Sequence, residues 1–266
     1  DELNDFKKDV WIKLILEKKL GYFALLRNLR NISEQAPEVL QTALEMLIDY
    51  DLIKKSLVMP FRFITAYEQF TNDDCNARLI RQYINKALEL SLNNVPKFDG
   101  DTVVVLDVSG SMQGKPSQIG SMFASALIKS NNADMIVFDT RSVKVNYDLD
   151  DTMINIIGKL RFNGGGTDFN CIFTSLNKAY KRIIILSDMQ GWVQNSSLKH
   201  LFNLYKLNYN CNPYIYSFDL QGYGSLMFPE NNVFCLAGFS DKIFDVMKLL
   251  ESDKQALINE INKIDL

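Results

Sequence analysis

Three polar loop motifs in this sequence hold the side chains that could do chemistry. Asp107, Ser109 and Ser111 form an Asp-x-Ser-x-Ser pattern, Thr167 follows three consecutive glycines, and Asp188 follows an apolar run. Carboxylate and hydroxyl oxygens on tight loops are the ligands that a hard divalent cation such as Mg²⁺ prefers. Each motif alone is also explained as a turn or a helix cap. Together they predict a metal site.

The elements that must position these loops occupy residues 98–266. Four continuous apolar runs predict central, parallel strands, because their side chains are apolar on both faces. They lie at 102–106, 135–138, 183–186 and 214–218, and 233–236 adds an edge strand. Helical patterns alternate with them at 119–130, 153–158, 169–180, 197–207 and 242–250. This order predicts a doubly wound, mostly parallel α/β domain whose ligands bind at the carboxyl ends of the strands, where the three loops lie.

Composition narrows the class of function. The chain has 266 residues and a formal charge of −3, so it is not expected to wrap a nucleic acid over its whole surface, although a local basic face stays open. It has no apolar run near the roughly 20 residues of a membrane span and no signal peptide, so we expect a soluble, cytoplasmic protein with no membrane partner. Its four separated cysteines and single histidine, His200, disfavour zinc sites, disulfides and Ser-His or Cys-His catalysis.

The first 97 residues predict an all-α segment. Apolar residues recur there at helical spacing, and Gly21, Pro37 and Pro60 occur where helices would end or begin. A last helix is expected from about Asp74 to Leu92. Successive short helices of this kind resemble units of a helical-repeat protein.

The α/β part resembles a von Willebrand factor A domain with a complete metal-ion-dependent adhesion site. The resemblance implies that Ser109 and Ser111 bind the metal through their hydroxyls, and that Thr167 binds it directly or through water. Asp107 and Asp188 would act mostly through water and by orienting the hydroxyls. The implied metal is Mg²⁺, with Mn²⁺ able to substitute. The implied activity is the capture of an acidic group from a protein partner, not catalysis.

The helical part resembles the end of a TROVE module, in residues 21–32 (GYFALLRNLRNI) and 59–68 (MPFRFITAYE). In that family a helical-repeat ring leads directly into a von Willebrand factor A domain. The resemblance implies an RNA-binding protein of the Ro ribonucleoprotein type, which binds small structured noncoding RNAs such as Y RNAs. The positive charges that we assign to RNA phosphates are Arg27, Arg30, Arg62, Lys54 and Lys55.

A complete TROVE ring needs several hundred residues of helical repeats, far more than precede the α/β part here. Because the first residue is Asp1 and not methionine, we expect an excised or processed piece; a ring completed by another chain and a reduced member are the alternatives. The oligomeric state stays open.

Two functions from different classes remain. The first is a non-enzymatic, Ro-like RNA-binding protein with a Mg²⁺ site, and the second is a metal-dependent protein-interaction module without RNA binding. Metal-assisted hydrolysis is disfavoured because it needs a general base. The remaining strand-end and loop carboxylates, Asp139, Asp168 and Asp219, are better explained as caps and turn residues.

Overall fold

The computed structural model describes residues 2–72, 74–190, 196–222, 228, 230–237 and 243–252. The chain divides into two compact units, residues 1–95 with 152–154, and residues 96–151 with 155–266. We call them the helical unit and the α/β unit. In the part of the chain that the structure describes, no helix combines the length and the apolar character needed to span a bilayer.

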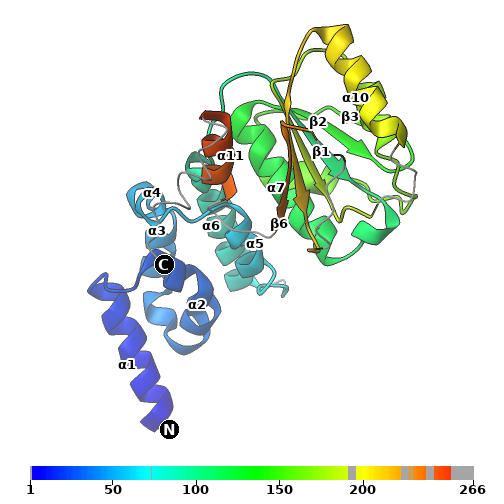
Figure 1. The fold of residues 1–266 in the computed structure, drawn as a ribbon. Helices are drawn as coiled ribbons and strands as arrows, with labels where there is room; N and C mark the ends of the chain where they lie inside the picture. The colour runs from blue at the N-terminus through cyan, green and yellow to red at the C-terminus, as the bar shows by residue number, and fades with distance from the viewer. Residues whose placement is uncertain are drawn as a thin grey trace, which may run out of the picture. The chain divides into compact units, whose positions relative to one another are not determined.

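The helical unit consists of a series of helices (Figure 1). They pack around an apolar core of aliphatic side chains together with the aromatic rings of Tyr22 and Phe63. Helix α2 directs its apolar stripe, including Leu25, Leu29 and Ile32, into this core. Asp49 and Asp74 fix the starts of α4 and α6, because each carboxylate accepts a first-turn backbone N–H, at 3.0 and 2.7 Å. The elements are α1 (Glu2–Leu16), α2 (Tyr22–Gln35), η1 (Pro37–Val39), α3 (Leu40–Leu47), α4 (Tyr50–Ser56), α5 (Phe61–Tyr67), α6 (Cys75–Ser91) and η2 (Leu92–Asn94).

The α/β unit is built on a twisted sheet with the strand order β3-β2-β1-β4-β5-β6 (Figure 1). β2 and β3 are antiparallel, and the other neighbouring pairs are parallel. The doubly wound, mostly parallel fold is therefore confirmed. Short β3 was not predicted. The strands are β1 (Thr102–Asp107), β2 (Asp134–Phe138), β3 (Ser142–Val145), β4 (Arg182–Ser187), β5 (Tyr214–Asp219) and β6 (Val233–Ala237).

Helices cover both faces of the sheet (Figure 1). On one face, the Phe123 ring of α7 lies 6.1 Å from Phe218 of β5 and 6.0 Å from Phe244 of α11, between ring centroids. On the other face, Phe173 of α9 and Phe202 of α10 belong to a continuous apolar core with β1 and β4. The elements are η3 (Gly110–Met112), α7 (Lys115–Asn131), α8 (Met153–Lys159), α9 (Asn170–Ser175), α10 (Ser196–Tyr209) and α11 (Ile243–Ser252).

Helix α9 is shorter than the helix expected at 169–180. It ends at Ser175, because Leu176 takes an extended conformation and is buried in the apolar core. The residues that follow form hydrogen bonds with Tyr205 of α10 and do not continue the helix. The Tyr180 backbone N–H donates to the Tyr205 hydroxyl at 2.9 Å, and Tyr205 donates to the carbonyl of Lys178. Tertiary contacts therefore override helical spacing in this segment.

Asp134, at the start of β2, is held by three donors. Lys144 and Lys178 lie 2.7 and 2.9 Å from its carboxylate oxygens, and the Tyr180 hydroxyl donates to it at 2.9 Å. Burial opposes ionisation, but these hydrogen bonds outweigh it and lower the pKa of Asp134 to about 2.

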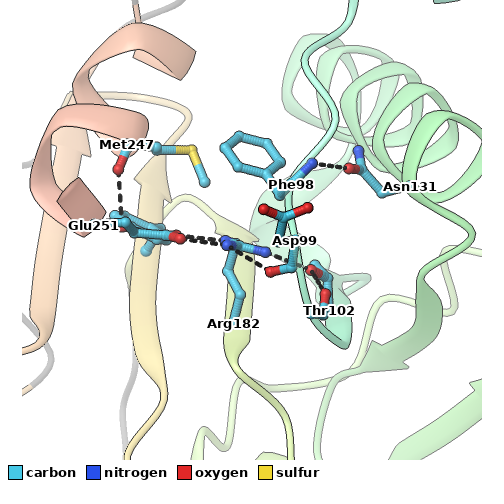
Figure 2. A network of polar contacts seen from close by, with 9 residues as sticks. Phe98, Asp99, Thr102, Asn131, Arg182, Met247 and Glu251 are labelled. Atoms are coloured by element: carbon cyan, nitrogen blue, oxygen red, sulfur yellow. Dashed lines mark hydrogen bonds and ion pairs between the residues drawn. The ribbon is translucent and has the colours of Figure 1, made fainter.

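A buried arginine ties together segments at the amino ends of the strands (Figure 2). Arg182, the first residue of β4, forms a two-pronged ion pair with Glu251 of α11, and its Nη1 donates to Thr102 Oγ1 at 2.8 Å. Its Nη2 also donates to the carbonyl of Asp99 at 3.4 Å, and its guanidinium lies 4.5 Å from the centre of the Phe98 ring. Strands β1 and β4, helix α11 and the segment before β1 are thus joined through one side chain.

Candidate functional site

The first polar loop folds back on the end of β1. Ser109 N donates to Asp107 Oδ1 at 2.9 Å, a contact that turns the chain sharply as it leaves the strand. The hydroxyl oxygens of Ser109 and Ser111 lie 3.3 Å apart. Ser109 is buried, whereas Ser111 is exposed. The loop therefore presents two neighbouring hydroxyls at the carboxyl edge of the sheet.

The end of β4 brings a second carboxylate to the same place. β1 and β4 pair in parallel, with Leu106 opposite Leu186, so Asp107 and Asp188 leave adjacent strands at one edge. Ser187 Oγ donates to Asp107 Oδ2 at 2.6 Å, so both oxygens of Asp107 are engaged. Burial raises the pKa of Asp107, and the Asp188 charge adds to the rise, although hydrogen bonds oppose it.

Asp188 carries one of the buried polar atoms that have no hydrogen-bond partner in the described part of the chain. Its Oδ1 accepts the backbone N–H of Gln190 at 3.2 Å, but its Oδ2 is buried and has no hydrogen-bond partner in the described part of the chain. An unmatched buried carboxylate oxygen costs free energy unless a cation or donor meets it. This oxygen fits a bound cation.

The glycine-rich loop packs against the serine loop. Gly110 N donates to the carbonyl of Gly165 at 2.9 Å. Space beside both glycines is tight: a Cβ on Gly110 would lie 3.2 Å from the Gly164 carbonyl oxygen, and one on Gly165 would lie 2.7 Å from Asp139 Oδ2. The contact places buried Thr167, two residues beyond Gly165, at the same edge of the sheet.

The predicted metal ligands thus share one rim, and the donor set suits a hard cation. Among the described residues, no cluster of three or more His, Cys, Asp or Glu side chains exists, so a metal at this rim depends on hydroxyl ligands as well as its two carboxylates. Asp139, Asp168 and Asp219 accept backbone N–H groups of the residues that follow them, which is the turn role expected of them. Ser187 was missed by the sequence analysis; a hydroxyl directly before a strand-end aspartate was its signal.

In the helical unit, two of the predicted RNA-binding arginines converge on one exposed ring. The guanidinium groups of Arg27 and Arg62 lie 5.6 and 5.8 Å from the centre of the Phe23 ring, and that of Arg62 lies 5.2 Å from the Phe61 ring. Phe23 is 42% exposed. Helices α2 and α5 therefore present two cations and an accessible aromatic face together.

The other three predicted RNA-binding residues have separate surroundings. Arg30 forms an ion pair with Glu34 at 2.9 Å, one turn further along α2. Lys54 and Lys55 lie in the last turn of α4, and the Lys54 ammonium is 5.9 Å from the Tyr50 ring. The five residues do not form one patch through any contact that the structure describes.

Comparison with known proteins places the chain in a family. The TROVE domain family matches residues 2–135, half of the chain. The chain belongs to the TROVE family. A second family, described as "VWA domain containing CoxE-like protein", matches residues 80–213 of this TROVE protein. The resemblances to a TROVE module and to a von Willebrand factor A domain are therefore confirmed.

A solved structure shares the fold of this TROVE protein. The crystal structure of the Deinococcus radiodurans RO (RSR) protein superimposes with a TM-score of 0.68 at 19% sequence identity. The match covers 85% of this chain and 52% of that one, so the chain spans about half the length of its structural relative. No curated protein matches the sequence.

Proposed function

We propose that this chain is a Ro-like, RNA-binding TROVE protein that binds small structured noncoding RNA, of the Y RNA kind, within a cytoplasmic ribonucleoprotein. Family membership supports an RNA partner for the helical unit. The observation that carries the proposal is the cluster of Arg27 and Arg62 around exposed Phe23. Guanidinium groups bind phosphates and an exposed ring stacks on a base, so the cluster has both parts of a single-strand contact.

Binding of a fluorescein-labelled pool of small structured RNAs, followed by anisotropy, tests this proposal. The double variant Arg27→Gln, Arg62→Gln removes two cations, so we expect about tenfold weaker binding. The slope of log binding constant against log salt concentration should also become shallower, by about 0.7 to 0.9 for each lost phosphate contact. Lys248→Gln, an exposed change in the α/β unit, is the control and should leave affinity unchanged. Equal affinity of the double variant and the wild type would refute the assignment.

We further propose that the rim of the α/β unit holds Mg²⁺, with Mn²⁺ able to substitute. Ser109, Ser111 and Thr167 would supply hydroxyl ligands, and Asp107 and Asp188 would bind through water and orient them. The unmatched, buried Asp188 Oδ2 supports a cation at this rim. Bound there, Mg²⁺ would supply an electrophilic centre for a partner's carboxylate; we expect binding without catalytic turnover.

Calorimetric titration with Mg²⁺ tests the metal site without RNA, which itself binds Mg²⁺. Ser109→Ala should abolish the binding heat, whereas the control Ser117→Ala, whose hydroxyl donates to the carbonyl of Gly114, should keep it. A wild-type chain that shows no Mg²⁺ binding would remove the site from the proposal while leaving the RNA function standing.

The second candidate function is metal-dependent capture of an acidic protein residue without RNA binding. The shared rim of Ser109, Ser111, Thr167 and the two aspartates favours it independently of the helical unit. Binding to a partner that disappears in Ser109→Ala, together with no RNA binding at low salt, would select this function over the first.

A further inference from the structure

A basic groove lies beside the proposed metal rim, entirely within the α/β unit. It encloses about 530 Å³ between the β2 and β3 strands and the chain after α8. Arg141, Lys159 and Arg161 line it, with one acidic residue, Asp139. The whole chain carries a formal charge of −3, so this concentration of positive charge is a local feature and not the general character of the protein.

The floor of the groove is aliphatic and open. Val137 of β2 pairs with Val143 of β3, so both side chains lie on one face of the sheet. Leu160 joins them in the lining. Val143 is 59% exposed, and Val137 opposite it is only partly buried. An exposed aliphatic side chain inside a basic groove suits a ligand that combines apolar and negatively charged groups.

The cationic side chains are positioned to bind such a ligand. Nη1 of Arg161 donates to the carbonyls of Gly158 and Leu160, at 2.7 and 3.2 Å, which orients a group that has five N–H donors. Arg161 and Arg141 are exposed. Lys159 pairs with Asp151 at 2.5 Å, so we assign the larger part of the binding to the two arginines.

The groove shares its walls with the metal rim. Val108, which lines the groove, stands between Asp107 and Ser109, and its N–H donates to the carbonyl of Phe138 at 2.8 Å. Asn163, also in the lining, begins the loop that leads to Thr167. A chain whose carboxylate reached the metal would therefore continue into the groove.

We propose that the groove binds an acidic peptide segment with an aliphatic residue, from a protein partner whose Asp or Glu reaches the neighbouring metal; this rests on the metal site proposed above. The charge of Arg141 and Arg161 complements acidic side chains, and Val143 and Leu160 receive the aliphatic one. A single-stranded nucleic acid fits less well, because none of the described lining residues is aromatic and bases would find no stacking surface.

An array of synthetic octapeptides tests the proposal with the full chain. Each peptide has a central Asp, and its other positions vary among acidic, aliphatic, neutral and basic residues. In Mg²⁺ we expect the fluorescently labelled chain to bind best where acidic and aliphatic residues flank the Asp. The double variant Arg141→Gln, Arg161→Gln should bind those peptides about tenfold more weakly, at roughly 0.7 kcal/mol per lost charge pair. It should also lose the preference for acidic flanking residues.

A matched control removes two charges elsewhere. Lys181→Gln with Lys248→Gln alters exposed lysines, one directly before β4 and one on α11, at the amino end of the sheet. This variant should bind the array like the wild type, and equal melting temperatures will show that both double variants fold.

The outcomes separate the groove from the metal. If Ser109→Ala loses Mg²⁺-dependent binding but keeps the weaker preference for acidic flanks, the groove is supported by itself. If the arginine variant keeps that preference, or the wild type shows none, the groove proposal is overturned while the metal site stands. A fluorescein-labelled octauridylate that binds the wild type but not the arginine variant would also overturn it, in favour of nucleic acid.

Discussion

Arg182 offers the sharpest test of what stabilises the α/β unit. Its side chain is 1% exposed and that of Glu251 is 13% exposed, so both charges of the ion pair are shielded from water. Arg182→Met keeps most of the side-chain volume but removes the guanidinium. The Glu251 carboxylate then loses its two-pronged partner, and Thr102 Oγ1 and the Asp99 carbonyl each lose a donor (Figure 2).

The magnitude follows from the buried carboxylate that remains. Removing one partner of a buried pair costs about 3 to 5 kcal/mol, because the other charge stays without compensation. The lost contact with the Phe98 ring, 4.5 Å away, adds about 1 kcal/mol or less. We therefore expect Arg182→Met to lower the free energy of unfolding by about 4 kcal/mol. In a unit of this size, that corresponds to a fall in melting temperature of about 8 to 16 °C.

Replacing both charges separates the cost of an unpaired ion from the value of the pair. Arg182→Met with Glu251→Met leaves no buried charge, so we expect it to recover most of the loss and to lie within about 2 kcal/mol of the wild type. Scanning calorimetry and urea unfolding measure all three chains. Lys181→Met changes the exposed neighbour of Arg182 and should shift stability by about 0.5 kcal/mol or less.

Two results would refute this reasoning. If the free energy of unfolding of Arg182→Met lies within about 1 kcal/mol of the wild type, well short of the expected loss, then Glu251 must become solvated when its partner is removed. A double variant less stable than Arg182→Met would show that the network stabilises through its shape and not through charge compensation.

Three further predictions concern other sites. The ionised Asp134 stabilises the fold fully above its unfolded pKa of 3.8, and this stabilisation is lost as the pH falls through its folded pKa of about 2. In urea unfolding, the loss of unfolding free energy caused by Asp134→Asn should therefore shrink from about 2 kcal/mol at pH 6 to about 1 kcal/mol at pH 3. Asp188→Asn should melt higher than the wild type in EDTA, since it removes one of two adjacent buried carboxylates, and should gain nothing from Mg²⁺; a lower melting temperature in EDTA would contradict this. Gly165→Ala places a Cβ 2.7 Å from a carboxylate oxygen and should weaken Mg²⁺ binding about tenfold by calorimetry, whereas at Gly166 the nearest atom is 3.5 Å away and Ala should be tolerated.

Strand prediction succeeded where burial was complete. β1 and β4 are buried at every position, so an uninterrupted run of β-branched and aliphatic residues identifies each one. β3 escaped prediction because it has four residues, lies at the edge of the sheet and is only partly buried. Its sequence, Ser-Val-Lys-Val, alternates polar and apolar residues, but four residues are too few for this pattern to stand out from the surrounding loop. The end of α9 escaped for another reason, since the extended Leu176 depends on packing partners distant in sequence.

The meeting of the three polar loops at one rim was predictable because the sheet topology brings them together. Parallel strands end at one edge, so polar residues after β1 and β4 meet whatever the intervening sequence. The contacts that refine the rim, such as Ser187 to Asp107 and Gly110 to Gly165, depend on register and loop conformation, which residue types alone do not specify. The convergence of Arg27 and Arg62 on Phe23 depends on how α2 and α5 pack together, so the spacing of residues within either helix could not predict it.

Strand β4 connects the two polar networks of the α/β unit. Arg182 begins the strand and joins it to α11, and Ser187 ends it and holds Asp107 beside Asp188. Between these ends the strand is fully buried and pairs with β1 and β5. The ladder hydrogen bonds to β1 and β5 hold the backbone of β4 in register when a side chain at its amino end is changed. Arg182→Met should therefore lose stability but keep its Mg²⁺ affinity at temperatures well below its melting point. A parallel loss of affinity would mean that the network at the amino end of β4 positions the metal rim as well as stabilising the fold.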